Sequence, residues 1–268
     1  MKIGLIGRGA IAQYVVEKLE AEGHRVAAYL VRPEKVQQAK RALSDGPARD
    51  VTVVSSVKDL PRDLDRLVDC AGHEALLQYG ADILRSGFNL TTVSLGALAD
   101  PQLEAGLRAA ALAGGTSLSL ASGAIGALDA LRSARVGTLQ QVRYIGRKPP
   151  AGWRGSAAEE KLDLSALKDE PATHFTGSAR EAARRYPKNA NVAAAVALAG
   201  IGFDKTEATL IADPTVSTNI HEIHVVGSFG EFEFRISGKP LPDNPKSSAL
   251  AAMSVVDSIL QSASPIRF

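Results

Sequence analysis

The stretch Lys-Ile-Gly-Leu-Ile-Gly-Arg-Gly-Ala-Ile-Ala, residues 2–12, decides the fold of this chain. Residues 2–6 are mostly apolar and predict a short buried strand, and the apolar residues that follow recur at helical spacing up to about Glu22. Between strand and helix lies the pattern Gly7-x-Gly9-x-x-Ala12. A glycine-rich turn in this position, at the start of a βαβ unit, is typical of a dinucleotide-binding loop.

The chemistry of phosphate binding requires these residue types. Gly7 permits the tight turn, Gly9 lets the backbone approach a pyrophosphate, and the small Ala12 lets helix and strand pack closely. The phosphates would then meet free N–H groups at the start of the helix. We therefore predict cofactor binding by Gly7, Gly9, Ala10 and Ile11, the alternative being an ordinary tight turn between strand and helix.

The second half of this fingerprint is missing. An acidic residue that holds the ribose 2′-hydroxyl of NAD is expected ~20 residues after the loop, near the end of the second strand. Here the predicted strand 26–31 is followed by Arg32, which could accept a 2′-phosphate. We therefore expect NADP to be usable as well as NAD. The alternative is that Arg32 is exposed and makes no cofactor contact.

The rest of the first half alternates between segments with the pattern of a strand and segments with the pattern of a helix. This alternation predicts a doubly wound parallel sheet covered on both faces, which is a Rossmann domain over residues 1–122. The predicted strands are 51–54, 67–71, 89–94 and 117–121, and the predicted helices are 33–45, 75–86 and 101–113.

The pattern changes after residue 122 and predicts a second, α+β domain over residues 123–245. Its last two strands alternate with period 2 and are joined by a glycine-containing turn, which indicates an antiparallel hairpin. The closing helix, in segment 246–268, can pack back on the first domain. The predicted strands are 140–147, 207–212, 219–226 and 231–236, and the predicted helices are 127–135, 178–185, 191–199 and 248–261.

Composition excludes several function classes for this chain of 268 residues. The net charge is +2 and basic residues are mixed with acidic ones, so no nucleic-acid partner is expected. No run of 18 apolar residues predicts a membrane helix, and the N-terminus does not resemble a signal peptide. The single cysteine, Cys70, cannot form an internal disulfide or a cysteine-based zinc site. We expect a cytoplasmic protein without a metal or membrane site.

Two of the five histidines lie on the predicted strand 219–226. His221 and His224 are separated by an odd number of positions, so they point to opposite faces and cannot form a metal pair. His221 shares its face with apolar side chains, and partial burial there would keep it neutral and suited to general-base work. From the pattern alone, a hydrogen-bonded core histidine is the favoured interpretation. His174 is placed in a loop.

Five short motifs follow one another in the second half. They are Ala-Ser-Gly-Ala-Ile-Gly-Ala-Leu-Asp at 121–129, Pro-Lys-Asn-Ala-Asn-Val-Ala at 187–193, Ile-Ala-Asp-Pro at 211–214, Asn-Ile-His-Glu at 219–222 and Asn-Pro-Lys-Ser-Ser at 244–248. Together with the glycine loop, this combination resembles the L-aspartate dehydrogenases over essentially the whole chain.

The resemblance implies NAD(P)-dependent oxidation of L-aspartate to iminoaspartate, which hydrolyses to oxaloacetate and ammonia or enters NAD biosynthesis. It implies a homodimer with residues 123–245 as the catalytic and dimerisation domain. His221 matches the active-site histidine of the family, which overrides the interpretation from pattern alone. Ala124 and one asparagine of the 187–193 motif match cofactor-contacting positions, and we favour Asn191 over Asn189.

Two substrate carboxylates require cationic partners. Candidates beside predicted loops are Arg147, Lys148, Lys188 and Lys246, although each taken singly is better explained as a solvated surface charge. Two other functions are weighed. One is a reductase of the dihydrodipicolinate reductase or homoserine dehydrogenase type, whose lysine- and histidine-rich motifs are not found here. The other is a non-catalytic NAD(P)-binding sensor, which would not need His221.

Overall fold

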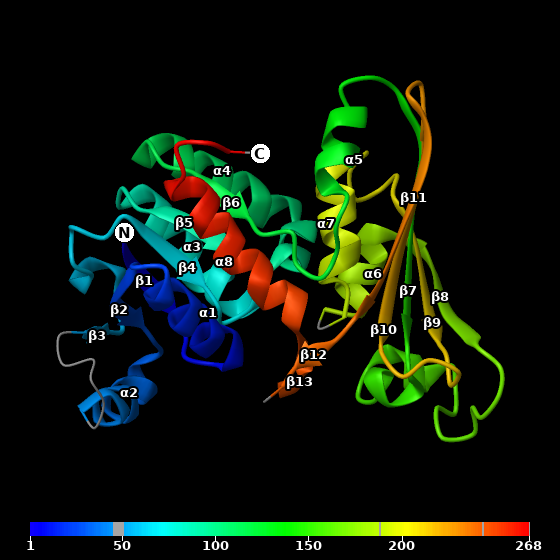
Figure 1. The fold of residues 1–268 in the computed structure, drawn as a ribbon, viewed down its shortest axis with the longest axis horizontal. Helices are drawn as coiled ribbons and strands as arrows, with labels where there is room; N and C mark the ends of the chain where they lie inside the picture. Colours follow the sequence, from blue (N-terminus) through cyan, green and yellow to red (C-terminus); the bar gives the residue numbers. More distant parts are fainter. Residues whose placement is uncertain (45–50, 188, 243, 268) are drawn as a thin grey trace. The chain divides into compact units, whose positions relative to one another are not determined.

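The computed structural model describes the whole chain except residues 45–50, 188, 243 and 268 (Figure 1). The chain divides into two compact units. The first contains Met1–Ala121 and Ala252–Phe268, and the second contains Ser122–Ala251. None of the helices in the described part of the chain is long and apolar enough to span a membrane.

The first unit is built on a six-stranded sheet whose strand order is β3-β2-β1-β4-β5-β6 (Figure 1). Every pairing is parallel, and the order reverses direction between β1 and β4, as in a doubly wound Rossmann sheet. The predicted fold class is confirmed. The strands are β1 (Lys2–Ile6), β2 (Arg25–Leu30), β3 (Thr52–Val54), β4 (Arg66–Asp69), β5 (Asn89–Thr92) and β6 (Leu118–Leu120).

Helices connect these strands and cover the sheet (Figure 1). The connecting helices are α1 (Ala10–Ala21), α2 (Val36–Ser44), α3 (His73–Arg85) and α4 (Pro101–Gly114), with short 3₁₀ turns η1 (Pro33–Lys35), η2 (Val57–Asp59) and η3 (Leu95–Ala99). A further helix, α8 (Ala249–Ala263), comes from the C-terminal segment. The limits of α4 follow from its sequence. Asp100 caps the first turn by accepting from the backbone N–H of Gln102, and Gly115 ends the helix in the left-handed conformation.

The core of the first unit forms where α1 and α8 pack together on β1. Ile3 and Leu5 of β1 are fully buried against Val15 and Leu19 of α1, and Val255 of α8 joins the same cluster. The C-terminal segment therefore returns to the first unit, as Figure 1 shows for the red helix.

The second unit is a five-stranded sheet of order β11-β10-β7-β9-β8 with helices on one face (Figure 1). Neighbouring strands are antiparallel except for the parallel pair β7 and β9. The strands are β7 (Leu139–Lys148), β8 (Ala172–Ser178), β9 (Glu207–Ala212), β10 (Asn219–Gly227) and β11 (Gly230–Gly238). The helices are α5 (Leu128–Ala134), α6 (Ala179–Arg185) and α7 (Asn191–Ala199), with 3₁₀ turns η4 (Pro150–Trp153) and η5 (Ala157–Glu160).

Two parts of the second unit differ from the prediction. The segment expected to be a loop around His174 is the edge strand β8, whose residues pair with residues of β9 that lie 29 to 40 positions further along the chain. A second small sheet, formed by β12 (Pro240–Leu241) and β13 (Asn244–Ser248), was not expected either. Both depend on pairing between strands and not on a strong local pattern.

Candidate functional site

The loop between β1 and α1 has the backbone that a phosphate loop requires. Gly7 has φ +82°, and a Cβ on it would lie 2.8 Å from the Cβ of Ala71, so no other residue fits without displacing the neighbouring loop. A Cβ on Gly9, by contrast, would meet nothing within 4 Å. The turn is therefore closed on the side of Ala71 and open above Gly9.

The start of α1 is open to an anion. Gly9 is its N-cap, no side chain caps the first turn, and that turn holds no acidic residue. Ala10 and Ile11 are the first two residues of the helix. Their N–H groups have no partner inside the helix, and the helix dipole favours negative charge there. The residues of this loop fit the pyrophosphate of a dinucleotide.

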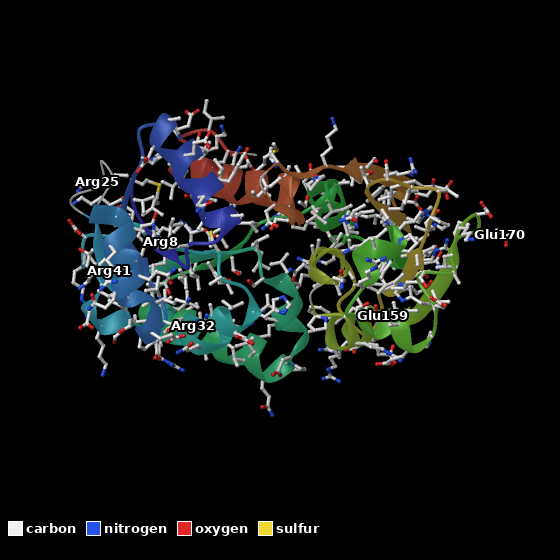
Figure 2. The ribbon with its side chains drawn as sticks, turned by 90° about the horizontal axis from the view of Figure 1, so that it is seen from below. Arg8, Arg25, Arg32, Arg41, Glu159 and Glu170 are labelled. Atoms are coloured by element: carbon white, nitrogen blue, oxygen red, sulfur yellow. The ribbon has the colours of Figure 1, made fainter. Side chains whose placement is uncertain are left out.

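A cavity of about 610 Å³ lies in the first unit beside this loop. Gly7 and Gly9 line it together with three basic residues, Arg8, Arg32 and Lys35. Arg32 is 62% exposed and pairs with Glu34 at 3.3 Å. Figure 2 shows Arg8, Arg32 and Arg41 on the blue, N-terminal part of the ribbon. The basic rim is suited to a phosphate on the adenosine ribose.

Asp69, at the end of β4, holds the loop that faces Gly7. Its buried carboxylate accepts hydrogen bonds from the N–H of Ala71 at 2.9 Å, from Thr92 Oγ1 at 2.8 Å and from Ser94 Oγ at 2.7 Å. Burial raises the pKa of Asp69, and these hydrogen bonds oppose that rise. Asp69 was not among the predicted site residues, although an acid at the end of a buried strand could have indicated it.

In the second unit, His221 lies on the inner face of β10 and is 4% exposed. The residue opposite it on β7 is Gly146. The Tyr144 hydroxyl occupies the space over Gly146, since a Cβ there would lie 2.5 Å from it, and is 2.8 Å from His221 Nδ1. The glycine thus leaves room for the tyrosine to reach the imidazole.

Burial is the main cause that lowers the pKa of His221 to about 3, and the positive charge of Lys148 lowers it further. The imidazole is therefore neutral at pH 7. Burial also raises the pKa of Tyr144 well above its usual range, so the phenol keeps its proton. A neutral imidazole whose Nδ1 is hydrogen-bonded to a phenol can accept a proton at Nε2 when Nδ1 carries the hydrogen.

His224 points to the other face of β10, as predicted. Its side chain is 27% exposed and its Nδ1 lies 2.7 Å from Glu233 Oε1 on the neighbouring strand β11. Among the described residues no group of three or more His, Cys, Asp and Glu side chains could hold a metal ion.

Lys148, the last residue of β7, is partly buried near His221. Its Nζ donates to Asn189 Oδ1 at 2.7 Å and lies 5.0 Å from the centre of the Trp153 ring. These surroundings remove enough water from the ammonium group to lower its pKa to about 8, so it remains mainly charged at pH 7.

A second buried histidine, His174, belongs to the same region. Its Nδ1 lies 3.1 Å from the Tyr186 hydroxyl, and its ring meets Trp153 edge-on with centroids 4.4 Å apart. Among the described atoms its Nε2 is buried without a hydrogen-bond partner. Burial, helped by the charges of Lys161 and Lys148, lowers its pKa to about 4. The prediction placed this residue in a loop and assigned it no role.

The remaining predicted positions are distributed as follows. Ala124 is 9% exposed in the segment between β6 and α5, and Asn191 is the first residue of α7. Arg147 pairs with the buried Asp213 at 3.2 Å, so its charge already has a partner. Lys188 lies outside the described residues, as does the side chain of Lys246.

Comparisons with known proteins agree for both halves of the chain. Residues 7–121 match the family model described as homoserine dehydrogenase, NAD binding domain, and residues 129–262 match the model described as aspartate dehydrogenase, C-terminal. The chain is 54% identical to an L-aspartate dehydrogenase of Ruegeria pomeroyi, over 100% of this chain and 94% of that protein.

The chain belongs to the L-aspartate dehydrogenase family.

Other relatives agree. An L-aspartate dehydrogenase of Pseudomonas aeruginosa is 47% identical over 96% of this chain and 95% of its own length. The crystal structure of aspartate dehydrogenase from Thermotoga maritima is 29% identical, with a TM-score of 0.74 over 100% of this chain and 99% of that chain. The homoserine dehydrogenase match is confined to the nucleotide-binding half, whereas the half that carries His221 matches the aspartate dehydrogenase model. Family membership thus makes the chain an oxidoreductase with a nicotinamide cofactor.

Proposed function

We propose that this protein catalyses the NAD(P)-dependent oxidation of L-aspartate to iminoaspartate, which hydrolyses to oxaloacetate and ammonia, and the reverse reductive amination. The observation that carries the proposal is the 54% identity to an L-aspartate dehydrogenase over the full chain. The buried, neutral His221 supports it, because amine oxidation needs a base that is unprotonated at neutral pH.

His221 is the proposed general base. The amino group of aspartate carries a proton that must leave before the C–H bond at Cα is oxidised. His221 Nε2 takes this proton while Nδ1–H donates to the Tyr144 oxygen, which holds the ring in one tautomer. The nicotinamide, when bound, supplies the acceptor for the hydride of Cα. The other product is the iminium form of oxaloacetate, which water converts to the keto acid and ammonia.

The proposed cofactor contacts lie in both units. Gly7, Gly9, Ala10 and Ile11 present the open turn and helix start of the first unit. In the second unit we assign Ala124 and Asn191 to the cofactor, as the family resemblance implies. Of the two asparagines of the 187–193 motif, we keep the preference for Asn191 over Asn189.

We propose that Arg32 makes NADP acceptable by pairing with the 2′-phosphate. Arg32→Asp should then weaken NADP binding on the order of 10- to 100-fold and NAD binding far less, since only NADP brings a phosphate to this position. Cofactor titrations by fluorescence or calorimetry measure both constants. Arg41→Asp is the matched control, because Arg41 is exposed nearby but does not line the cavity. Equal weakening of NAD and NADP by Arg32→Asp would remove Arg32 from the ribose.

The function is tested by NAD(P)⁺ reduction with L-aspartate, compared with D-aspartate, L-glutamate and L-homoserine. Activity restricted to L-aspartate supports the proposal, and activity with L-homoserine would favour the alternative reductase type. A protein that binds NAD(P) without reducing it with any of these would be a sensor.

We also propose a homodimer, a cytoplasmic location where NAD(P) is available, and a supply of iminoaspartate to NAD biosynthesis. The family resemblance supports these assignments. Light scattering on the purified protein tests the dimer, and a monomeric mass would contradict it.

A further inference from the structure

We propose that Lys148 binds a carboxylate of the substrate and forms its counter-ion next to His221. This proposal rests on the proposed function and deepens it. Four observations carry it. They are the position of Lys148 on the sheet, the absence of an anionic partner for it among the described residues, the effect of its charge on the pKa of His221, and the Trp153 ring beside it.

Lys148 and His221 lie on the same face of the second sheet. His221 is directly opposite Gly146 on the neighbouring strand, and residues opposite each other share a face. Lys148 is two positions beyond Gly146 on β7, so its side chain leaves the sheet on that face as well. The general base and the cation therefore stand on adjacent strands, at one end of β7.

The charge of Lys148 has no carboxylate partner among the described residues. Its side chain contacts the neutral amide oxygen of Asn189 and the ring of Trp153. Asp213 directly follows Ala212, the residue of β9 that pairs with Lys148. Its carboxylate accepts hydrogen bonds from Arg147 and from Thr215 instead. An ammonium group has three donors, so Lys148 retains donors for a ligand. A desolvated cation of this kind is stabilised by an anion from outside, and L-aspartate brings two carboxylates.

Binding a carboxylate at Lys148 would also prepare the base. The charge of Lys148 is the second cause, after burial, that lowers the pKa of His221. An anion paired with the ammonium offsets that charge, so His221 becomes more basic when the substrate is present. The free site then keeps His221 neutral, and the occupied site lets it accept the proton of the substrate amine.

Trp153 gives a direct reporter for this site, because it is the only tryptophan in the chain. It is fully buried, donates from Nε1 to the carbonyl of Ile211 at 3.0 Å and carries the Lys148 ammonium over its ring. A carboxylate that binds to Lys148 changes the charge at the indole face. The intrinsic fluorescence of the protein should respond to that change.

The test compares Lys148→Met with the unchanged protein. Methionine has a similar length without the charge, and such a replacement of a desolvated cation is generally tolerated by the fold, which thermal unfolding checks. We expect the KM for oxaloacetate in reductive amination to rise on the order of 100-fold. Lys205→Met is the matched control, because Lys205 is an exposed lysine of the same unit, and the KM of this variant should equal that of the unchanged protein.

Two further measurements make the result decisive. Pyruvate lacks the second carboxylate of oxaloacetate. A loss in kcat/KM that is larger for oxaloacetate assigns Lys148 to that carboxylate, whereas an equal loss for both assigns it to the carboxylate beside the keto group. Succinate, a dicarboxylate that does not react, should change the Trp153 fluorescence of the unchanged protein and of Lys205→Met, but not of Lys148→Met.

The failures of the two proposals are distinguishable. An active protein whose Lys148→Met variant keeps its KM and its succinate response overturns the role of Lys148 and leaves the dehydrogenase standing. A protein that is inactive with aspartate but responds to succinate through Lys148 overturns the proposed reaction and keeps the carboxylate site.

Discussion

His221→Ala is expected to lower kcat for aspartate oxidation by about 100- to 10,000-fold, the usual contribution of a positioned general base. The side chain is buried on the inner face of β10 with Nδ1 hydrogen-bonded to Tyr144, so the substitution removes Nε2, the proposed proton acceptor. Steady-state kinetics with saturating cofactor measure the loss. Cofactor affinity should change little, because the imidazole acts on the amine and not on the phosphates.

His224→Ala is the internal control on the same strand. It removes a partly exposed histidine that pairs with Glu233 on the other face, so kcat should stay near normal. The pH profile adds a second measurement. Oxidative kcat/KM falls as His221 becomes protonated, and because the pKa of His221 is lowered to about 3, this acid limb lies far below pH 6.5. Near-normal turnover of His221→Ala would show that the base has been wrongly assigned.

Gly114→Ala is expected to destabilise the protein by about 3 kcal/mol or more. A Cβ on Gly114, the last residue of α4, would lie only 1.9 Å from the carbonyl oxygen of Leu84 in α3. The obstacle is backbone, so one of two packed helices must move. Urea unfolding followed by circular dichroism gives the change in the free energy of unfolding.

Gly106 provides the matched control on the same helix. A Cβ there would meet nothing within 4 Å, so Gly106→Ala removes only the helix penalty of glycine and should stabilise the protein by about 0.5–1 kcal/mol. The same substitution thus has opposite signs eight positions apart. Equal stabilities of the two variants would contradict the close approach of α3 and α4.

The Rossmann half could be predicted from the sequence because its signals are local. The strand, glycine turn and helix at residues 2–21 follow one another without interruption, and the expected parallel sheet has the observed alternation of elements. The opposite orientations of His221 and His224 also follow from the two-residue period of a strand.

The site around Lys148 could not be predicted in the same way. Its contacts join residues far apart in sequence: Lys148 and Asn189 are separated by 41 positions, and Tyr144 and His221 by 77. Strand β8 was missed because its pairing with β9 is equally non-local, and with it the buried position of His174. Spacing within one segment carries no information on such pairs, so Lys148 could be named only as one of four candidate cations.

The most direct test of the central claim follows isotopically labelled ammonium during NAD(P)H-dependent reduction of oxaloacetate. The account predicts that the label appears in L-aspartate, in step with NAD(P)H oxidation, and that no NAD(P)H is consumed when ammonium is omitted. Consumption without ammonium, with malate as the product, would show that the protein reduces the keto group itself and would contradict the assignment as an L-aspartate dehydrogenase.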